Sequence, residues 1–584
     1  MGKITGNQML VKALQKEGVE KIFGYPGACV IDIFDELYKQ EEMELVLPRH
    51  EQALVHAADG YARSTGKVGV CIATSGPGAT NLVTGIATAN YDSVPLVCFT
   101  GQVPLTSIGN DSFQEIDIVG VTRNIAKFVI VCRKRSDLNR IIKEAFYIAK
   151  SGRPGPVLID LPKDVMGELG SDIYPEEVNI RGYKPNTKVH IPQVRRAMRT
   201  LLKAKKPLFL IGGGTKIANA HQEMVKLAEL VRVPVITTIM GRGVLPTNHP
   251  LYYGNIGMHG SYAANEAVTN CDVLFSIGTR FNDRITGKLG TFAPHAKIIH
   301  IDIDTASISK NVTVDIPIVA DAKEAIVELI KVAEEHPAVD TSKWLDMMDA
   351  WKAKHPIKME ETNELNPQEI IEAINENFKE SIVVTDVGQN QMWATQFVEL
   401  WGKSQFLTSG GLGTMGYGFP AALGAQIGNP DREVVAICGD GGVQMNIQEM
   451  ATAVIQELPV VLCVLNNGYL GMVRQWQDLF YQKRYGGTCL MRRKECEHFC
   501  GKADRITCPP YTPDFIKLAE SYGAQGIRVT KKEEIKAAFD QAKAKKDGPT
   551  LIEFIIDREE LVMPMVKGGG SLTDLIMSRE ERRK

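Results

Sequence analysis

Short apolar runs alternate with helical patterns in three blocks of this chain, and this alternation constrains the fold more than any other feature. The blocks cover about 1–165, 190–335 and 366–556, and their apolar runs include VGVCIATS, PLFLIGGG and EVVAICGDGG. Strands that alternate with helices form parallel sheets with helices on both faces. We therefore expect an α/β protein of three doubly wound domains with mostly parallel sheets, followed by a C-terminal tail over 557–584.

Composition and charge argue against several classes of protein. The 584 residues are 44% hydrophobic and 23% charged, and the net charge of −2 argues against a nucleic-acid partner. No apolar run reaches the roughly 18 residues that a membrane helix needs, and the N-terminal segment lacks the apolar core of a signal peptide. The 11 cysteines, several of them inside apolar runs, are typical of reduced thiols. We expect a cytoplasmic protein that binds no membrane.

One carboxylate stands among three glycines at the end of an apolar run, in ICGDGGVQMN at 437–446. Asn467 follows Asp440 by 27 residues, and the pattern between them predicts a helix at about 446–457 and a strand at 459–465. Both residues then fall at the carboxyl ends of parallel strands, where such sheets bind ligands. Carboxylate and amide oxygens suit Mg²⁺ bridged to phosphates, and glycines before a helix suit a diphosphate. GDG alone marks a turn in most proteins, whereas the joint pattern is far more specific.

The joint pattern resembles the thiamine diphosphate motif, and the resemblance extends over nearly the whole chain to the large, catalytic subunit of acetohydroxyacid synthase (acetolactate synthase). The segments that carry it are PRHEQALVHAADGYAR, TSGPGATN, DSFQE, SGRPGPVLIDLPKD, GTRFNDRITGKL, DVGQNQMWA, GLGTMGYGFPAALGAQ and LGMVRQWQ. The resemblance implies a pyrimidine-binding domain at 1–165, an FAD-binding domain at 190–335 and a diphosphate- and Mg²⁺-binding domain at 366–556. It also implies a homodimer or homotetramer that holds thiamine between subunits, and a separate regulatory small subunit.

The resemblance implies which residues hold thiamine diphosphate and Mg²⁺. The metal would be bound by Asp440, Asn467 and the carbonyl of Tyr469. The cofactor contacts would be Gly388, Gln389, Asn390, Gly413, Met415, Gly441 and Gly442. The family usually has histidine where Asn390 stands, so this contact departs from the pattern. Met415 would hold the cofactor in the bent shape that brings its amino group towards C2, which is a positional effect.

The resemblance also implies catalytic and substrate-binding residues. Glu51, in PRHEQ, would drive the aminopyrimidine of the cofactor to its imino form. Without the resemblance, the better interpretation of Glu51 is that its charge merely stabilises the N-terminus of a helix. Gln114 and Phe113 would lie near the reacting carbon, and Lys163 at the substrate channel. For the acceptor ketoacid, the residues would be Arg284, which pairs with its carboxylate, and Trp476, which packs on the extra methyl of 2-ketobutyrate.

The central block carries a glycine run, IGGGTK at 211–216, which alone is weak evidence of a nucleotide site. The FAD contacts implied by the resemblance are Arg153, Gly212, Gly213, Gly214, Thr238, Met258, Arg280, Asp302 and Asp321. Asn282 replaces one aspartate of the usual RFDDR pattern. In the resembling family the flavin is structural, an inheritance from pyruvate oxidases.

The residues favour a transferase that joins two ketoacids. Such an enzyme decarboxylates pyruvate on thiamine diphosphate and ligates the hydroxyethyl group to pyruvate or 2-ketobutyrate, giving 2-acetolactate or 2-aceto-2-hydroxybutyrate for branched-chain amino acid biosynthesis. The chain lacks the His-His pair with which decarboxylases of the wider family protonate instead. Two alternatives stay open: an FAD-dependent pyruvate oxidase, which the central block also suits, and a non-catalytic, cofactor-binding regulatory homologue.

Two late segments leave alternatives open. Cys489, Cys496, Cys500 and Cys508 lie within 488–510 together with His498, in a spacing unlike that of common zinc ribbons. A metal site, a redox-sensitive disulfide and unliganded thiols are all compatible with this pattern. The tail at 557–584 carries three glycines at 568–570, and it is either a lid that orders over the site or a frayed terminus.

Overall fold

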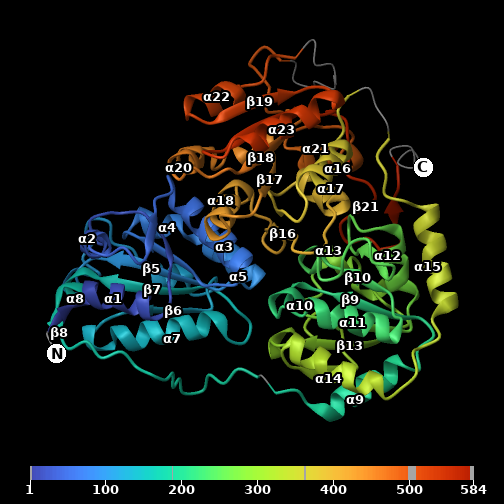
Figure 1. The fold of residues 1–584 in the computed structure, drawn as a ribbon, viewed down its shortest axis with the longest axis horizontal. Coiled ribbons are helices and arrows are strands. Elements are labelled where there is room, and N and C mark those ends of the chain that lie inside the picture. The colour runs from blue at the N-terminus through green and yellow to red at the C-terminus, as the bar shows by residue number, and fades with distance from the viewer. Residues whose placement is uncertain (1–2, 187, 361–363, 497–507, 579–584) are drawn as a thin grey trace.

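The computed structural model describes residues 3–186, 188–360, 364–496 and 508–578. These residues form three domains, each built on a six-stranded sheet in which every strand pairing is parallel. Helices cover both faces of each sheet (Figure 1). The expected α/β class with three doubly wound domains is therefore confirmed. Within the described residues, no helix is both long and apolar enough to cross a membrane.

The first domain holds the sheet β3-β2-β4-β5-β7-β6. Its strands are β2 (Lys21–Gly24), β3 (Glu44–Val46), β4 (Gly69–Ala73), β5 (Leu96–Gln102), β6 (Phe128–Val131) and β7 (Val157–Pro162). Its helices are α1 (Gly6–Lys16), α2 (Ile31–Tyr38), α3 (Glu51–Thr65), α4 (Pro77–Asn81), α5 (Val83–Asp92), α6 (Ile118–Thr122), α7 (Leu138–Lys150) and α8 (Lys163–Gly167). The short strands β1 (Ile4–Thr5) and β8 (Leu169–Gly170) pair antiparallel beside it.

The central domain holds the sheet β11-β10-β9-β12-β13-β14. Its strands are β9 (Pro207–Ile211), β10 (Val235–Thr237), β11 (Tyr252–Asn255), β12 (Val273–Ile277), β13 (Lys297–Asp302) and β14 (Ile316–Val319). Its helices are α9 (Ile191–Leu201), α10 (Gly213–Ile217), α11 (His221–Val231), α12 (Tyr262–Asn270), α13 (Asp283–Thr286) and α14 (Ala322–Glu334), and α15 (Ser342–Lys354) follows. Counted along the chain, this order is 3-2-1-4-5-6, the order of dinucleotide-binding sheets.

The third domain holds the sheet β16-β15-β17-β18-β20-β19. Its strands are β15 (Ile382–Thr385), β16 (Gln405–Thr408), β17 (Val434–Gly439), β18 (Val461–Asn466), β19 (Gln525–Val529) and β20 (Thr550–Ile555). Its helices are α16 (Pro367–Asn377), α17 (Gln389–Phe397), α18 (Gly418–Gly428), α19 (Asp440–Val443), α20 (Met450–Ile455), α21 (Gly471–Phe480), α22 (Phe515–Ser521) and α23 (Ile535–Ala544). Counted along the chain, the first and third sheets share the order 2-1-3-4-6-5, so these two domains have the same topology.

The segment between Asp440 and Asn467 differs slightly from its sequence-based prediction. The predicted helix at 446–457 is a 3₁₀ turn at Ile447–Glu449 followed by the shorter α20. The strand begins at Val461 rather than at 459. Pro459 has no N–H to donate to a neighbouring strand, so the ladder begins after it. The order of one helix and one strand between the two polar residues is as predicted.

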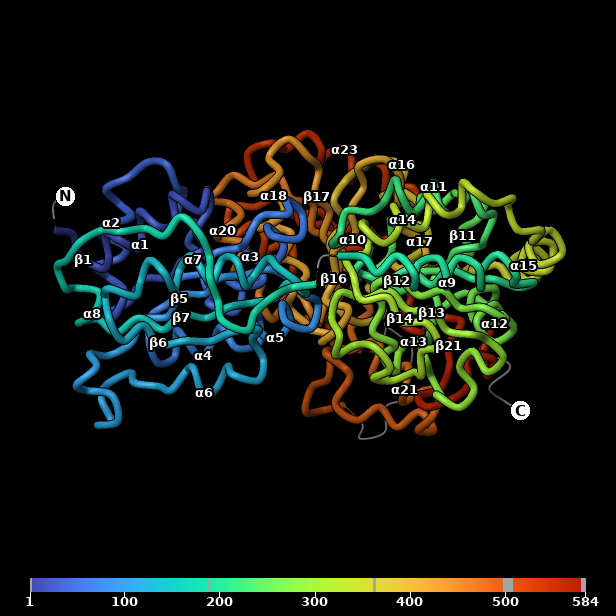
Figure 2. The backbone as a smooth tube through the Cα atoms, turned by 90° about the horizontal axis from the view of Figure 1, so that it is seen from below, coloured from blue at the N-terminus to red at the C-terminus, as the bar shows by residue number. Residues whose placement is uncertain are grey.

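The first and third domains are joined through α3 and α18, which lie side by side (Figure 2). Their backbones nearly touch: a Cβ added to Gly424 would lie 1.7 Å from the carbonyl oxygen of Ala57, and one added to Gly60 would lie 2.0 Å from that of Ala421. Only glycine allows this approach. One apolar core runs through both domains, from Leu54 and Ala58 to Leu423 and Val434. The two domains of one chain are thus held in a fixed relation.

The C-terminal tail packs on the central domain over its described residues. Its strands β21 (Met565–Val566) and β22 (Leu575–Ile576) pair antiparallel. Val566 N–H donates to the carbonyl of Met258, and the carbonyl of Gly570 accepts from Lys288 N–H, both at 2.8 Å. Leu572 is buried in the core of the central domain. The described part of the tail is therefore packed rather than frayed.

Candidate active site

The polar loops of the third domain meet in one small pocket at the carboxyl end of its sheet. The pocket lies between β15 and β17, where the strand order reverses and where sheets of this kind bind ligands. Of the residues predicted to hold thiamine diphosphate and Mg²⁺, it is lined by Gly388, Gln389, Asn390, Met415, Asp440, Gly441, Gly442, Asn467 and Tyr469. Gly413 lies outside this lining, two residues before Met415, with open space around it. Four separate loops therefore supply one pocket.

Asp440 is the buried carboxylate of this pocket. Its Oδ2 accepts a hydrogen bond from Gly468 N–H at 3.0 Å, and no described cation pairs with it. Burial raises the pKa of Asp440 to about 7, since the charged form has lost its solvation. Asn467 is fixed beside it: Nδ2 donates to Gln389 at 3.1 Å, and Oδ1 accepts from Tyr469 N–H at 3.0 Å. A buried carboxylate without a cation and an oriented amide oxygen fit a hard divalent cation.

The backbone around this pocket has features of an anion site. Gly388 has φ +126°, a conformation that other residues rarely adopt, and it immediately precedes the N-terminus of the nine-residue α17. Free N–H groups and the helix dipole favour negative charge at this position. Asn390 Nδ2 donates to the carbonyl of Val387 at 3.3 Å, while its buried Oδ1 has no partner among the described residues. The pocket thus fits a diphosphate bridged to a metal.

The predicted catalytic residues of the first domain form a second, separate group. Glu51 begins α3, and its Oε2 accepts from Asn81 Nδ2 at 3.0 Å, while Gly78 lies close to its Oε1. Gln114 has φ +59° and packs against Gly76, whereas the side chain of Phe113 is 85% exposed. None of these residues lines the pocket of Asp440 in the same chain.

Lys163 lies at the start of α8, directly after β7, at the same carboxyl edge of the first sheet as the loop of Gly76 and Gly78. Its Nζ donates to the carbonyl of Ala28 at 2.9 Å, in the loop after β2, and lies 3.9 Å from a carboxylate oxygen of Asp32. The side chain is 41% exposed, so the ammonium remains accessible to an anionic ligand.

A second cleft, with a volume of about 260 Å³, is lined mostly by residues of the central domain. It opens at the carboxyl ends of β9, β12 and β13, at the reversal of the strand order. Of the predicted FAD contacts it is lined by Arg153, Gly213, Gly214, Thr238, Arg280, Asp302 and Asp321. Gly212 stands just behind the lining, against the carbonyl of Gly278. Met258 is not among the lining residues; its N–H donates to the carbonyl of Arg284, which does line the cleft, and its carbonyl accepts from Val566 N–H.

The charges in this cleft are suited to a phosphate-bearing ligand. Burial lowers the pKa of Arg280, and the nearby Arg153 lowers it further. Arg153 Nε donates to Ser93 at 2.9 Å, which orients the guanidinium. Burial raises the pKa of Asp302 to about 6, so this carboxyl is placed to accept or to share a proton with a bound hydroxyl. Two guanidiniums, a glycine turn and a carboxyl fit the phosphates and ribose of a dinucleotide.

Comparison with known proteins matches the three domains one by one. The chain matches three family models: thiamine pyrophosphate enzyme, N-terminal TPP binding domain, at residues 4–121; central domain at 194–329; and C-terminal TPP binding domain at 386–554. A probable acetolactate synthase large subunit from Methanocaldococcus jannaschii is 46% identical, over 98% of this chain and 95% of that protein. The chain belongs to the acetolactate synthase large-subunit family. Two further members are the acetolactate synthase large subunit of Corynebacterium glutamicum (44% identical, over 98% of this chain and 90% of that one) and the isozyme 3 large subunit of Escherichia coli (42%, over the full length of both).

The residues predicted for the acceptor of an acetolactate synthase lie on both sides of the tail. Arg284 lines the central cleft, and its side chain is 62% exposed. Trp476, in α21, packs against Phe480 with ring centroids 5.4 Å apart. A Cβ added to Gly568 of the tail would lie 3.0 Å from its ring. The tail thus connects the Trp476 helix to the segment that follows Arg284.

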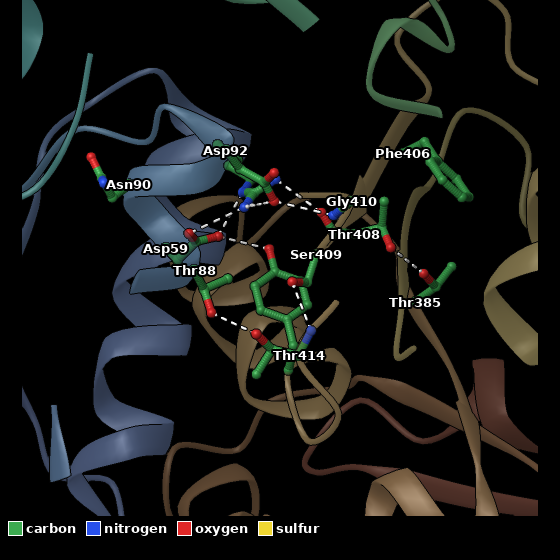
Figure 3. A network of polar contacts seen from close by, with 12 residues as sticks. Asp59, Thr88, Asn90, Asp92, Thr385, Phe406, Thr408, Ser409, Gly410 and Thr414 are labelled. Carbon is green, nitrogen blue, oxygen red and sulfur yellow. Dashed lines mark hydrogen bonds and ion pairs between the residues drawn. The ribbon is translucent and has the colours of Figure 1, made fainter. Parts of the chain in front are cut away.

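A buried ionic network between the first and third domains was not predicted from the sequence. Arg63 donates to both carboxylate oxygens of Asp59, at 2.6 and 3.2 Å, and to Asp92 at 2.9 Å. Tyr417 OH donates to Asp59 at 2.7 Å, and Arg63 also donates to the carbonyl of Thr408 at 3.0 Å. Its members come from α3, α5, the end of β16 and the residue before α18. Figure 3 labels Asp59, Asp92 and Thr408 among them. HAADGYAR places Asp59 and Arg63 on one helix face, four residues apart, and this spacing was the only sequence signal of the network.

The described part of the cysteine segment lies beside the pocket of Asp440. Cys489 is bridged through its backbone to Tyr469, and the Sγ of Cys508 accepts from Arg558 at 3.3 Å. Arg558 in turn donates to Tyr469 OH at 2.6 Å. Cys496 accepts from Arg493 N–H, and the described cysteines are all free thiols. Cys500 and His498 lie outside the described residues, and among the residues that are described no three or more His, Cys, Asp or Glu side chains are grouped to hold a metal ion.

Proposed function

We propose that this chain catalyses the acetolactate synthase reaction, in which pyruvate is decarboxylated and joined to pyruvate or 2-ketobutyrate. The observation that best supports this proposal is the pocket that Asp440 and Asn467 form where the strand order of the third sheet reverses. The chain that contains it is 42–46% identical to acetolactate synthase large subunits over nearly its whole length. The products are 2-acetolactate and 2-aceto-2-hydroxybutyrate, and the setting is cytoplasmic branched-chain amino acid biosynthesis.

The third domain holds Mg²⁺ and the diphosphate of thiamine diphosphate. Asp440, Asn467 and the Tyr469 carbonyl are the metal ligands, and the N-terminus of α17 with Gly388 receives the phosphates. At the position where the family usually has histidine, Asn390 would contact the diphosphate through the second N–H of Nδ2, because its buried Oδ1 can only accept. When bound, thiamine diphosphate supplies the carbanion and the electron sink that decarboxylation requires.

Glu51 acts on the cofactor from a second copy of the chain. The Glu51 group and the Asp440 pocket are separate within one chain, and α3 and α18 fix the two domains against each other. A homodimer in which the first domain of one copy faces the third domain of the other brings the two groups together. Asn81 fixes one carboxyl oxygen of Glu51, leaving the other to exchange a proton with the cofactor's pyrimidine ring. Met415 supports the cofactor from the pocket side.

The central cleft holds FAD in a structural role. Its strand order, glycine turn and paired guanidiniums support a dinucleotide ligand. The same cleft favours one second candidate, an FAD-dependent pyruvate oxidase. The relatives are named large subunits, and this name supports a separate, small regulatory subunit as a partner.

A product assay tests the proposed function. Purified chain is incubated with pyruvate, Mg²⁺ and thiamine diphosphate, with and without FAD. We expect acetolactate and CO₂ in equal amounts, with no uptake of oxygen. Acetate with peroxide would identify an oxidase, acetaldehyde would identify a simple decarboxylase, and no consumption of pyruvate would identify a non-catalytic homologue.

Trp476→Leu is expected to reduce the preference for 2-ketobutyrate over pyruvate as acceptor. The indole packs on the extra methyl of 2-ketobutyrate, and one methylene in such a pocket is worth about 1–3 kcal/mol. Competition between the two acceptors measures the product ratio directly. Trp351→Leu, a tryptophan of α15 on the far side of the central domain, is the matched control. An unchanged product ratio in Trp476→Leu contradicts the acceptor role.

Deletion of the tail after Val566 is expected to lower turnover more than it lowers stability. The tail contacts Trp476 through Gly568 and Lys288 through Gly570, so it covers the acceptor side and excludes water. Loss of the buried Leu572 lowers the melting temperature, which a thermal scan quantifies separately. Full acetolactate formation by the truncated chain would end the lid proposal.

A further inference from the structure

One loop of the third domain lines both the central cleft and the pocket of Asp440. It spans residues 409–417, between β16 and α18. Gly410, near its start, lines the central cleft, and Met415, near its end, lines the pocket of Asp440. Only four residues separate Gly410 from Met415, so the two cavities share one short stretch of backbone.

Asp92 holds the end of the loop that faces the cleft. It is the last residue of α5 and is 5% exposed. Its Oδ2 accepts from Gly410 N–H at 3.1 Å and from Arg63 at 2.9 Å. Its Oδ1 is buried without a hydrogen-bond partner among the described residues. A Cβ added to Gly411 would lie 2.6 Å from this oxygen and 3.3 Å from Arg280 Nη2, which places the acceptor in the wall of the cleft.

Thr88 holds the other end of the loop from the same face of α5. It stands four residues before Asp92, and its hydroxyl lies 2.7 Å from that of Thr414 in a fully buried pair (Figure 3). Asp386 then fixes the residues after Met415, accepting from the N–H groups of Gly416 and Gly418 at about 3.0 Å. Met415 is therefore placed by a loop that α5 of the first domain clamps at two points.

We propose that Asp92 is a positioning residue that couples occupancy of the central cleft to the placement of Met415 in the pocket of Asp440. This inference rests on the proposed function, in which the cleft takes FAD and the pocket takes thiamine diphosphate. A ligand that donates a hydrogen bond to Asp92 Oδ1 fixes the orientation of the carboxylate. Because Oδ2 of the same carboxylate accepts from Gly410 N–H, the position of the loop is fixed as well. Thiamine diphosphate then binds to a pocket wall that is already ordered.

Thermodynamic linkage makes this coupling measurable. Each cofactor tightens the binding of the other by the same factor, which for coupled sites is typically about 5–150-fold. A residue that only stabilises the domain interface would change the melting temperature without changing this factor. The ratio of FAD dissociation constants, with and without thiamine diphosphate, therefore distinguishes positioning from a merely structural role.

The experiment titrates FAD into the cofactor-free chain and follows flavin fluorescence, with and without saturating thiamine diphosphate and Mg²⁺. In the natural chain we expect the FAD dissociation constant to fall at least about 5-fold when thiamine diphosphate is present. Asp92→Asn is expected to bring this ratio close to one while FAD still binds. The double variant Thr88→Val with Thr414→Val removes both hydroxyls of one buried pair, a change that is nearly neutral for folding, and it is expected to reduce the ratio as well.

Thr122→Val is the matched control, since Thr122 is also buried but its hydroxyl donates to the carbonyl of Ile118 within α6 rather than to the loop. It is expected to keep the natural ratio. A ratio of one in the natural chain, or a natural ratio in the Thr88–Thr414 double variant, overturns the coupling while leaving the proposed reaction intact. Failure of the natural chain to bind FAD overturns the assignment of the cleft, and the coupling with it.

Discussion

Glu51→Gln lowers the rate of acetolactate formation by about 10²–10⁴-fold, the usual contribution of a general acid–base group. Glutamine keeps the shape of the side chain and still accepts from Asn81, so the helix start and the α4 turn stay in place. What it removes is the capacity to exchange a proton with the cofactor. We therefore expect the affinity for thiamine diphosphate and the melting temperature to remain close to those of the natural chain.

The measurement is steady-state turnover with saturating cofactors, alongside a calorimetric titration of thiamine diphosphate. Glu144→Gln is the matched control, because Glu144 lies on the outer helix α7 and pairs only with the exposed Arg140. It is expected to leave the rate unchanged. Turnover by Glu51→Gln close to the natural rate would remove Glu51 from the chemistry.

Asp440→Ala produces a different defect, in binding rather than in the chemical step. Loss of a residue that only supports a metal ligand typically weakens metal binding by roughly 10–100-fold. Asp440 is a direct ligand, so its loss is expected to weaken the Mg²⁺-dependent binding of thiamine diphosphate by at least as much. Excess Mg²⁺ and cofactor should then partly restore turnover. The cofactor-free chain should keep its melting temperature, because Gly468 N–H retains Asn466 as an acceptor and an unfavourably buried carboxylate is gone.

Calorimetric titration of thiamine diphosphate at several Mg²⁺ concentrations checks this expectation. Asp431→Ala, a change at an exposed turn between α18 and β17, serves as the control. Natural cofactor affinity in Asp440→Ala, or a defect that no excess of cofactor relieves, would show that Asp440 does not hold the metal.

Local patterns were enough to predict the fold class and the pocket of the third domain. Apolar runs define the strands of a parallel sheet, and the residues just after them, such as Asp440 and Asn467, necessarily gather at one edge. The start of β18 was misplaced because Pro459 interrupts the ladder. The shared strand order of the first and third domains was not visible, since topology depends on which strands pair and not on the identity of their residues.

Long-range contacts account for what the sequence could not predict. Arg63, Asp92 and Tyr417 come from separate segments of the chain, and the packing of α3 on α5 and on α18 brings them together. The backbone of Met258 is hydrogen-bonded to the tail, whose course across the central domain has no local signal in the sequence. The resemblance that indicated Glu51 carries no geometry, and the separation of Glu51 from Asp440 emerges only from the arrangement of the domains.

The most direct test of this account mixes two inactive chains. Glu51→Gln and Asp440→Ala are co-expressed, and acetolactate formation is measured against each variant alone. If each site combines Glu51 of one copy with Asp440 of the other, random assembly into symmetric dimers leaves about a quarter of all sites intact, and we expect activity near that fraction of the natural enzyme's. Activity of the mixture no higher than that of the separate variants would contradict a site shared between two copies of the chain.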